Sequence, residues 1–412
     1  MDKVLDDLFD ILRINSVYSN DLLPFGKGNV LCLIQMFQKA AKAGFKFNNV
    51  DYYCGYIEFG SGEKMLGILC HLDVVDVNKD KWLTDPFTPT IIDNKIYARG
   101  VQDDKGPLMC AFYAMKELKE EGFKPKKRIR LIMGCNEESG CLCMERYKEK
   151  EEIPTISFSP DAEYPVIFGE KGILVIKICG KIDSIIKEFH AGTVHNVVPD
   201  TAKVVIDKEY IYEGKAAHAM NPNLGINAIS KAIDDLKNKF SDPIIDLLDK
   251  YFTNDSFGKK INVDMVDPLM NELTSNLAIL NIENDNFEMV IDYRIPKNIC
   301  KRTIIKNIKE IVKDYNLNVE VIHDMKVHMV NPNSILVKKL LKAYQNNTGD
   351  YVAKPISIGG GTYAKCFKNS VAFGTKFKDE EDVCHIDNEY VDIDKLRLNI
   401  KILKDAIKEL AK

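Results

Sequence analysis

The hydrophobic pattern of the chain opens with two amphipathic stretches. Apolar side chains recur about every 3.6 positions in residues 2–12 and again in residues 30–44, where Gly44 ends the pattern. A third stretch of this kind, residues 107–122, has Pro107 near its first turn, where proline is tolerated. These three segments predict helices in the first third of the chain.

Short and almost continuous apolar runs alternate with these helices and indicate buried strands. The runs cover residues 65–70, 128–134 and 155–159. Strands of this composition belong to sheets that are covered on both faces. The alternation of strands with helices therefore predicts an α/β domain whose sheet is mixed, mostly parallel and covered by helices.

The pattern changes near residue 173 and changes back near residue 327. Short alternating strands and two helical stretches lie between these points, which is typical of an α+β unit. A chain of 412 residues also exceeds a single comfortable core. We therefore expect a catalytic domain made of residues 1–172 and 327–412, with residues 173–326 inserted as a lid.

Composition and charge exclude several classes of protein. The 57 basic and 61 acidic side chains give a net charge of -4, so a polycationic surface for nucleic acid is not expected. No apolar run approaches the roughly 20 residues of a membrane span, and the acidic N-terminus does not resemble a signal peptide. Eleven cysteines without paired CxxC modules favour a reducing compartment. We expect a cytoplasmic protein, monomeric or homodimeric, without nucleic-acid or membrane partners.

Acidic and imidazole side chains follow the ends of the predicted strands. His71 and Asp73 follow the first apolar run, Glu137 and Glu138 follow the second, and Asp161 follows the third. Ligands of α/β sheets bind outside the carboxyl ends of the strands, so we expect these five side chains to lie close together.

Two further residues complete a set that can hold metal ions. Asp103 lies just before the third predicted helix, and His385 lies in a charged stretch near the C-terminus. Two imidazoles, three carboxylate ligands and a spare carboxylate suit two divalent metals that share a bridging carboxylate, with a base left to activate water. Taken singly, each residue has a simpler explanation: Asp103 or Asp104 caps a helix, the glutamate pair forms a surface turn, and His385 lies in an exposed loop.

Polar groups in the second half of the chain have structural alternatives as well. His218 lies between two alanines, which is more typical of a packed core histidine, and Arg294 in a predicted strand is typical of an ion pair. The glycines at 359–361 lack the lysine pattern of a phosphate loop. Consecutive glycines can instead expose backbone N–H groups that hold a carboxylate.

The motifs together resemble the PepV-like dipeptidases. These belong to a larger family of dinuclear metallopeptidases that also holds aminoacylases, desuccinylases and glutamate carboxypeptidases. The resemblance covers nearly the whole chain and implies a metal-dependent dipeptidase that acts on a small peptide with a free amine. The motifs, in chain order, are GILCHLDVV, ARGVQDDKGP, NEESG, SPDAEYPVIFGEKG, HNVVPD, GKAAHA, DYRIP, GGGTYAK and HIDNEY.

The resemblance also implies two divalent metal ions, zinc or manganese, and assigns their ligands. His71 and Asp161 would complete the site of one metal, Glu138 and His385 would complete the other, and Asp103 would bridge them. Imidazole and carboxylate ligands accept zinc, manganese or cobalt, so the residue types alone do not select the metal.

The remaining roles implied by the resemblance concern proton transfer and the substrate. Glu137 would act first as general base and then as acid to the leaving amine, while Asp73 would orient His71 through its carboxylate. Asp104 or Glu163 would face the ammonium group of the substrate. Two residues of the lid, His218 and Asn196, would stabilise the oxyanion. The C-terminal carboxylate of the substrate would be bound by Arg294, Gly360 and Gly361.

Two positions depart from the family pattern, and two other functions remain open. The resemblance predicts arginine at the position of Lys365, and Lys378 stands where relatives tend to carry proline. The same metal core also serves N-acyl amino acid hydrolases, which would require activity on N-acetylated substrates. A non-catalytic binding protein on the same scaffold is the alternative outside the enzymes.

Overall fold

The computed structural model describes residues 3–412 and divides the chain into two compact units. Unit 1 consists of Met1–Phe168, Met329–Ile356 and Thr362–Lys412, and unit 2 consists of Gly169–His328 and Ser357–Gly361. Met1 and Asp2, which the sequence assigns to the first domain, lie outside the described residues. Within unit 2, the Arg294 guanidinium donates a hydrogen bond to the Gly359 carbonyl of the short segment Ser357–Gly361.

Most of a nine-stranded sheet lies in unit 1. Its four central strands run parallel, in the order β6 (Arg128–Gly134), β3 (Met65–His71), β7 (Ile156–Ser159) and β21 (Ser370–Ala372). Antiparallel strands flank them, with β2 (Cys54–Phe59) and β1 (Lys46–Val50) beside β6 and β9 (Ile167–Glu170) beside β21. The short strands β19 (His328–Met329) and β20 (Ile356–Ile358) both pair with β9.

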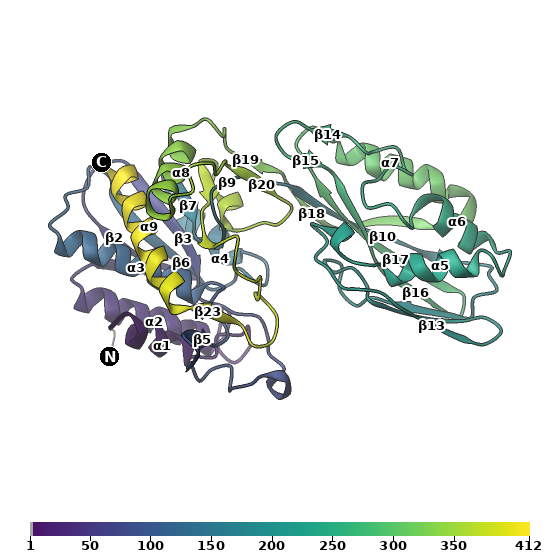
Figure 1. Ribbon diagram of the computed structural model, residues 1–412, viewed down its shortest axis with the longest axis horizontal. Coiled ribbons are helices and arrows are strands. Elements are labelled where there is room, and N and C mark those ends of the chain that lie inside the picture. The colour runs from purple at the N-terminus through teal and green to yellow at the C-terminus, as the bar shows by residue number, and fades with distance from the viewer. Residues whose placement is uncertain (1–2) are drawn as a thin grey trace. The chain divides into compact units, whose positions relative to one another are not determined.

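Helices cover the sheet of unit 1, as the apolar strands require. All seven residues of β3 are buried, since a strand with two covered faces exposes no side chain. The long helix α9, yellow in Figure 1, packs against α3 and α8. The helices are α1 (Lys3–Leu12), α2 (Lys27–Lys42), α3 (Lys105–Glu120), α4 (Leu142–Lys150), α8 (Ile335–Thr348) and α9 (Ile393–Ala411).

Unit 2 is built on a seven-stranded antiparallel sheet with its own core. The strand order is β13 (Glu209–Glu213), β12 (Thr201–Val205), β11 (Glu188–Ala191), β16 (Thr274–Glu283), β17 (Asn286–Ile295), β10 (Gly172–Lys181) and β18 (Asn318–Met325). Alternate residues of β10, β16 and β17 share a hydrophobic cluster with three helices. These are α5 (Ala228–Leu236), α6 (Pro243–Tyr251) and α7 (Lys301–Val312).

Short strands complete the structure of both units. In unit 1, β4 (Thr90–Ile92), β5 (Lys95–Tyr97) and β23 (Tyr390–Asp392) form a three-stranded sheet, and β8 (Ala162–Glu163) pairs with β22 (Thr375–Lys376). In unit 2, β14 (Val266–Asp267) pairs with β15 (Asn271–Glu272). Within residues 3–412, no helix combines the length and the apolar composition needed to cross a membrane.

The structure confirms the predicted fold class and refines it in two respects. The parallel part of the first sheet is limited to its four central strands. The α+β unit has three helices, whereas the sequence predicted two. The additional helix is α6. Its signal in the sequence was Asp242, which caps the helix by accepting from two backbone N–H groups, followed by Pro243 at the first helical position.

Candidate metal centre

The strand order brings the predicted acidic and imidazole residues to one edge of the sheet. Strand β3 extends one residue further than the sequence predicted, so that His71 is its last residue. Asp73 lies two residues after it. Glu137 and Glu138 follow β6, which pairs with β3 in parallel, and Asp161 follows β7 on the other side of β3. Because these three strands are parallel, their carboxyl ends meet at the same edge.

The Asp103 carboxylate lies between two imidazoles that come from distant parts of the chain. Its Oδ1 is 2.8 Å from His71 Nε2, and its Oδ2 is 3.0 Å from His385 Nε2. The same His385 nitrogen is 3.0 Å from Glu138 Oε1, and His71 Nε2 is 3.6 Å from Asp161 Oδ2. Each oxygen of Asp103 therefore faces a different group of ligand atoms, as a bridging carboxylate does.

The donor atoms of this cluster fit divalent cations. His71 Nε2 and Asp103 Oδ1 are buried, and neither has a hydrogen-bond partner among the described residues despite their short separation. Buried polar atoms are almost always paired, so two orphaned atoms at one point indicate a missing partner. Ligand atoms of His71, Asp103 and Glu138 all lie within 4.8 Å of one another, and imidazole with carboxylate oxygen is a donor set that zinc and manganese accept.

The electrostatics of the cluster also favour the binding of cations. Desolvation, followed by the charge of Asp103, raises the pKa of Glu138 and Asp161 above the usual range. Burial opposes ionisation of Asp103, but the two nearby imidazoles lower the pKa of that carboxyl. Hydrogen bonds to Asp103 and Glu138 raise the pKa of His385 to about 11. Such crowding of carboxylates favours positive charge at this point.

Asp73 acts on its neighbours differently from the way the sequence suggested. The His71 ring contacts the backbone carbonyl of Asp73, with 3.0 Å between Nδ1 and the oxygen, whereas the carboxylate is 3.6 Å away. The two carboxylate oxygens instead accept hydrogen bonds of 3.0 Å from the backbone N–H groups of Glu137 and Glu138. Asp73 therefore orients His71 through its main chain and holds the glutamate pair through its side chain.

Asp104 contradicts two expectations. It occupies the N-cap position of α3 but makes no side-chain cap, and Asp103 is turned toward the imidazoles, so neither residue caps the helix. Asp104 is fully buried and accepts a hydrogen bond of 2.9 Å from the His71 backbone N–H. Burial raises the pKa of Asp104 to about 8. A buried side chain behind His71 does not face a substrate ammonium group.

In unit 2, the motifs HNVVPD and GKAAHA lie against each other. Val197 forms an antiparallel bridge with His218, and the Asn196 carbonyl accepts from the Ala219 N–H at 2.8 Å. His218 is exposed and its Nδ1 accepts from the Met220 N–H at 3.1 Å, so it is not the packed core histidine that its alanine neighbours suggested. Asn196 and His218 are thus brought together within this unit.

Arg294 is buried and held on two sides. Its Nε and Nη2 donate to the two oxygens of Asp292 at 2.8 and 2.9 Å, and its Nη1 donates to the Gly359 carbonyl at 2.8 Å. The ion-pair explanation for Arg294 is therefore correct for its native contacts. Since a guanidinium has five N–H donors, these three bonds leave two for other acceptors. The carbonyl that Arg294 contacts comes just before Gly360 and Gly361 in the chain.

Three residues of these clusters were missed in the sequence. Asp292 holds Arg294 and also contacts the half-exposed His195, with 2.9 Å between Oδ2 and Nδ1. Its signal was the alternation of β17, which places residues two apart on one face. Glu389 of the HIDNEY motif is fully buried and binds the loop of Asp103. An acidic residue four positions after His385 was the only signal for it.

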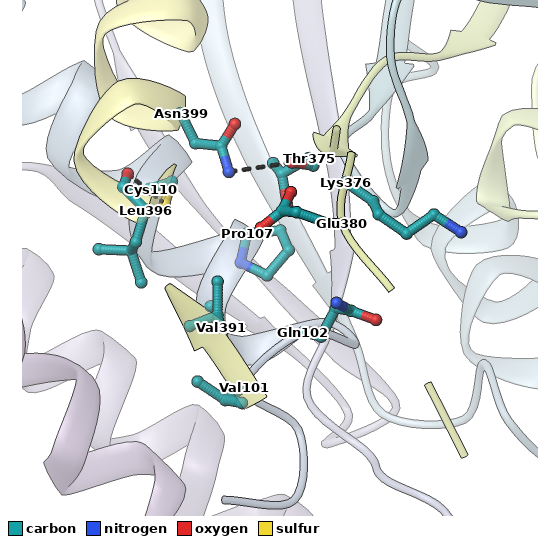
Figure 2. Close-up of a pocket in the computed structure, with 11 residues that line it drawn as sticks. Val101, Gln102, Pro107, Cys110, Thr375, Lys376, Glu380, Val391, Leu396 and Asn399 are labelled. Carbon is teal, nitrogen blue, oxygen red and sulfur yellow. Dashed lines mark hydrogen bonds between the residues drawn. The ribbon is translucent and has the colours of Figure 1, made fainter. Parts of the chain in front are cut away.

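A small cavity in unit 1 lies beside the loop of Asp103 but is not a peptide site. It is lined by α3, α9 and nearby loops, with Gln102 and Glu380 among its walls (Figure 2). Its volume of about 10 Å³ is near the minimum for one water molecule. The Asn399 amide donates to the Thr375 carbonyl across this cavity at 3.0 Å, which closes it further.

The chain matches known proteins over nearly its whole length. A protein of Staphylococcus haemolyticus named "Putative dipeptidase" is 35% identical, covering 99% of this chain and 97% of that protein. A Bacillus subtilis protein of the same name is also 35% identical, covering 100% and 98%. The alignment with the first relative extends over 456 residues, more than the 412 of this chain, so this chain is the shorter of the two.

Solved structures share the fold at low sequence identity. Human carnosine dipeptidase 1 superposes with a TM-score of 0.66 at 15% identity, covering 100% of this chain and 96% of that one. The aminoacylhistidine dipeptidase of Vibrio alginolyticus gives 0.65 at 14% identity, covering 99% and 96%. The model of peptidase family M20/M25/M40 matches residues 67–409. With a family match over most of its length and relatives at 35% identity, the chain belongs to peptidase family M20/M25/M40.

Proposed function

We propose that the protein is a metal-dependent dipeptidase that hydrolyses dipeptides with a free amine. The observation that carries the proposal is the Asp103 carboxylate, which lies within 3.0 Å of an imidazole nitrogen on each side. Two relatives at 35% identity are named "Putative dipeptidase", which supports the substrate class.

Five side chains would hold two divalent ions, zinc or manganese. When bound, such ions supply Lewis acidity and lower the pKa of a coordinated water. The distances support Asp103 as the shared ligand, with one imidazole on each side of it. The proposed ligands are His71, Asp103, Glu138, Asp161 and His385.

Glu137 would move the proton during the reaction. Its backbone N–H donates to Asp73, so the peptide that carries Glu137 is fixed relative to the cluster. Desolvation raises the pKa of Glu137 well above its usual value. A raised pKa suits a carboxylate that takes a proton from water and returns it to the leaving amine.

Residues of unit 2 would bind the substrate. Arg294 keeps two N–H donors for a carboxylate, and the backbone of Gly360 and Gly361 follows the carbonyl that Arg294 contacts. Asn196 and His218 would stabilise the oxyanion, as polar groups held in one place within their unit. Substitution of His218 by alanine should lower kcat, whereas substitution of Arg294 should raise KM for substrates with a free carboxylate.

We further propose a cytoplasmic location and a monomeric or homodimeric state. All eleven cysteines are free thiols in the structure, which suits a reducing compartment. The two departures from the family pattern fall outside the proposed ligand set. Lys365 belongs to the short helical turn Tyr363–Cys366 and is half-buried, and Lys378 is exposed.

The proposal is tested by hydrolysis of a small panel with chelator-stripped protein reloaded with zinc or manganese. The panel pairs Ala-His and Leu-Gly with their N-acetylated forms and with tripeptides. We expect cleavage that depends on added metal and is confined to the free-amine dipeptides. Cleavage of the acetylated compounds alone would make the protein an N-acyl amino acid hydrolase. Metal binding without any cleavage would make it a binding protein.

A further inference from the structure

Glu389 is a fully buried carboxylate that closes the loop carrying Asp103. Its Oε1 accepts from the backbone N–H groups of Gln102 and Asp103, at 2.7 and 3.1 Å. Its Oε2 accepts from the Gly100 N–H at 2.9 Å and from the Arg99 guanidinium at 2.8 Å. Four donors from five consecutive residues therefore converge on one side chain.

The same contacts bind the His385 loop to the Asp103 loop. Glu389 follows His385 by four residues, and its own carbonyl accepts from the Ala98 N–H at 3.2 Å. From the other side, Gln102 Oε1 accepts from the Val383 N–H at 3.0 Å and from the Cys384 thiol at 3.1 Å. The two loops are thus joined on both sides of the pair of proposed ligands.

The position of this junction matters because Asp103 is the proposed bridge. Asp103 Oδ2 and His385 Nε2 are 3.0 Å apart and belong to loops that are distant in the chain. The distance between them depends on the contacts that hold one loop against the other. The buried Glu389 carboxylate, with its four hydrogen bonds, is a rigid contact of this kind.

We infer that Glu389 is a positioning residue that holds Asp103 and His385 at the separation a two-metal site needs. The inference rests on the proposed function, since it takes both residues as metal ligands. Glu389 is not one of the proposed ligands and would act through the backbone of Asp103. Its loss should weaken metal binding and disturb the coupling between the two ions.

A purely structural role is the competing explanation, and the chain offers a matched control for it. Glu58 in β2 also pairs with a buried arginine, with 2.7 Å between its Oε2 and Arg130 Nη2. Arg130 lies near the start of β6, whereas Glu137 follows the end of that strand. Loss of Glu58 should therefore destabilise unit 1 without reaching the metal centre.

The test compares Glu389→Gln with Glu58→Gln in the full chain. A glutamine at 389 places its amide N–H₂ against either the Arg99 and Gly100 donors or the Gln102 and Asp103 donors, so two bonds are replaced by donor–donor contacts. Metal affinity is measured by competition of Zn²⁺ with a chromophoric chelator. The coupling is measured as the exchange-coupled Mn²⁺ pair signal in electron paramagnetic resonance, and stability as the thermal midpoint of the metal-free protein.

We expect Glu389→Gln to bind metal about 10–100-fold more weakly and to lose the coupled Mn²⁺ signal, as losses of outer-shell partners do. Glu58→Gln should lower the thermal midpoint by a comparable amount but keep the wild-type metal affinity and the coupled Mn²⁺ signal. Wild-type affinity and signal in Glu389→Gln would overturn the inference. If the wild-type chain itself failed to bind two metals, the proposed function would be wrong instead.

A second variant covers the case in which Glu389→Gln does not fold. Glu389→Asp keeps the charge opposite Arg99 but shortens the side chain by one methylene, so it cannot reach all four donors at once. We expect a smaller loss of affinity in the same direction and a weakened pair signal. Metal binding by Glu389→Asp that equals wild type in both readouts would also overturn the inference.

Discussion

The two units each contain a cluster of buried charge, and the clusters are built in opposite ways. In unit 1 carboxylates gather around two imidazoles, two buried ligand atoms have no hydrogen-bond partner among the described residues, and several carboxyl pKa values are raised. In unit 2 Asp292 is paired with Arg294 and His195, and its pKa is lowered by them despite burial. The carboxylates of the first cluster outnumber its two imidazoles, whereas the buried charges of the second cluster compensate one another.

The difference indicates that the cluster in unit 1 is suited to bind cations, whereas the Asp292 cluster in unit 2 is suited to hold Arg294 in place. Raised carboxyl pKa values mean that the protein itself disfavours the fully ionised cluster, and bound cations would relieve this unfavourable energy without protonation of the carboxylates. The Asp292 cluster needs no ligand, because its buried charges are already compensated. It fixes the plane of Arg294 and leaves two donors in a defined direction. Four predictions test this contrast, in decreasing order of expected effect.

Glu137→Gln should produce the largest effect, on activity alone. Loss of a general acid–base group costs about 10²–10⁴-fold in rate, whereas Glu137 is not among the proposed ligands. We expect kcat on a dipeptide to fall by that factor with unchanged metal content, measured by kinetics and by elemental analysis. Glu145→Gln, at an exposed position of α4, is the control and should be silent. Normal turnover in Glu137→Gln would contradict the mechanism.

Asp292→Asn should produce the largest effect on stability. The substitution leaves Arg294 buried with a neutral partner, and breaking a buried pair in this way costs about 3–5 kcal/mol. Guanidinium unfolding followed by far-UV circular dichroism measures the loss. Glu288→Gln on the same strand breaks a partly exposed pair with Lys177 and should cost at most about 1 kcal/mol. Equal losses of unfolding free energy in the two variants would contradict the view that the buried charges of the Asp292 cluster compensate one another.

The contrast also explains how much the sequence revealed. His71, Glu137 and Asp161 could be predicted because each follows an apolar run, and parallel strands bring their ends together by a general rule. The fold class followed from the same periodicity. The α6 helix was missed although it is as long as α5, and its start was marked by the cap residue Asp242 and by Pro243.

Residues that act through the main chain could not be predicted. Asp73 was expected to orient His71 through its carboxylate, but its backbone carbonyl contacts the ring and its carboxylate binds two N–H groups. Glu389 likewise binds three backbone N–H groups. Every residue offers the same backbone donor, so such partners leave no mark in the residue types. Their identity depends on loop conformation, which periodicity does not determine.

Asp161→Asn should separate binding from folding in the metal centre. Desolvation and the charges of Asp103 and Asp104 raise the pKa of Asp161, so a neutral isostere should leave the metal-free protein as stable as wild type or more stable. The metal-dependent gain, about 2.7 kcal/mol at 100 times the Kd of wild type, should largely disappear. Thermal unfolding with chelator and with added Zn²⁺ measures both. A marked destabilisation of the metal-free variant would place Asp161 among the structural carboxylates.

The smallest effect concerns pH and should have opposite signs in the two clusters. In the metal-free protein the pKa of His385 is raised to about 11, so its stabilising contribution is complete below the unfolded value near 6.5 and is lost as pH rises toward 11. The pKa of Asp292 is lowered, so its contribution is complete above about 4 and is lost only in stronger acid. Fluorescence of Trp82, the sole tryptophan and a residue of unit 1, reports the first change. We expect its unfolding midpoint to fall between pH 6 and pH 9 with chelator. Asp292→Asn should leave that fall intact while reducing the acid loss seen by circular dichroism below pH 4. A Trp82 midpoint that stays constant or rises over this range would contradict the raised pKa of His385.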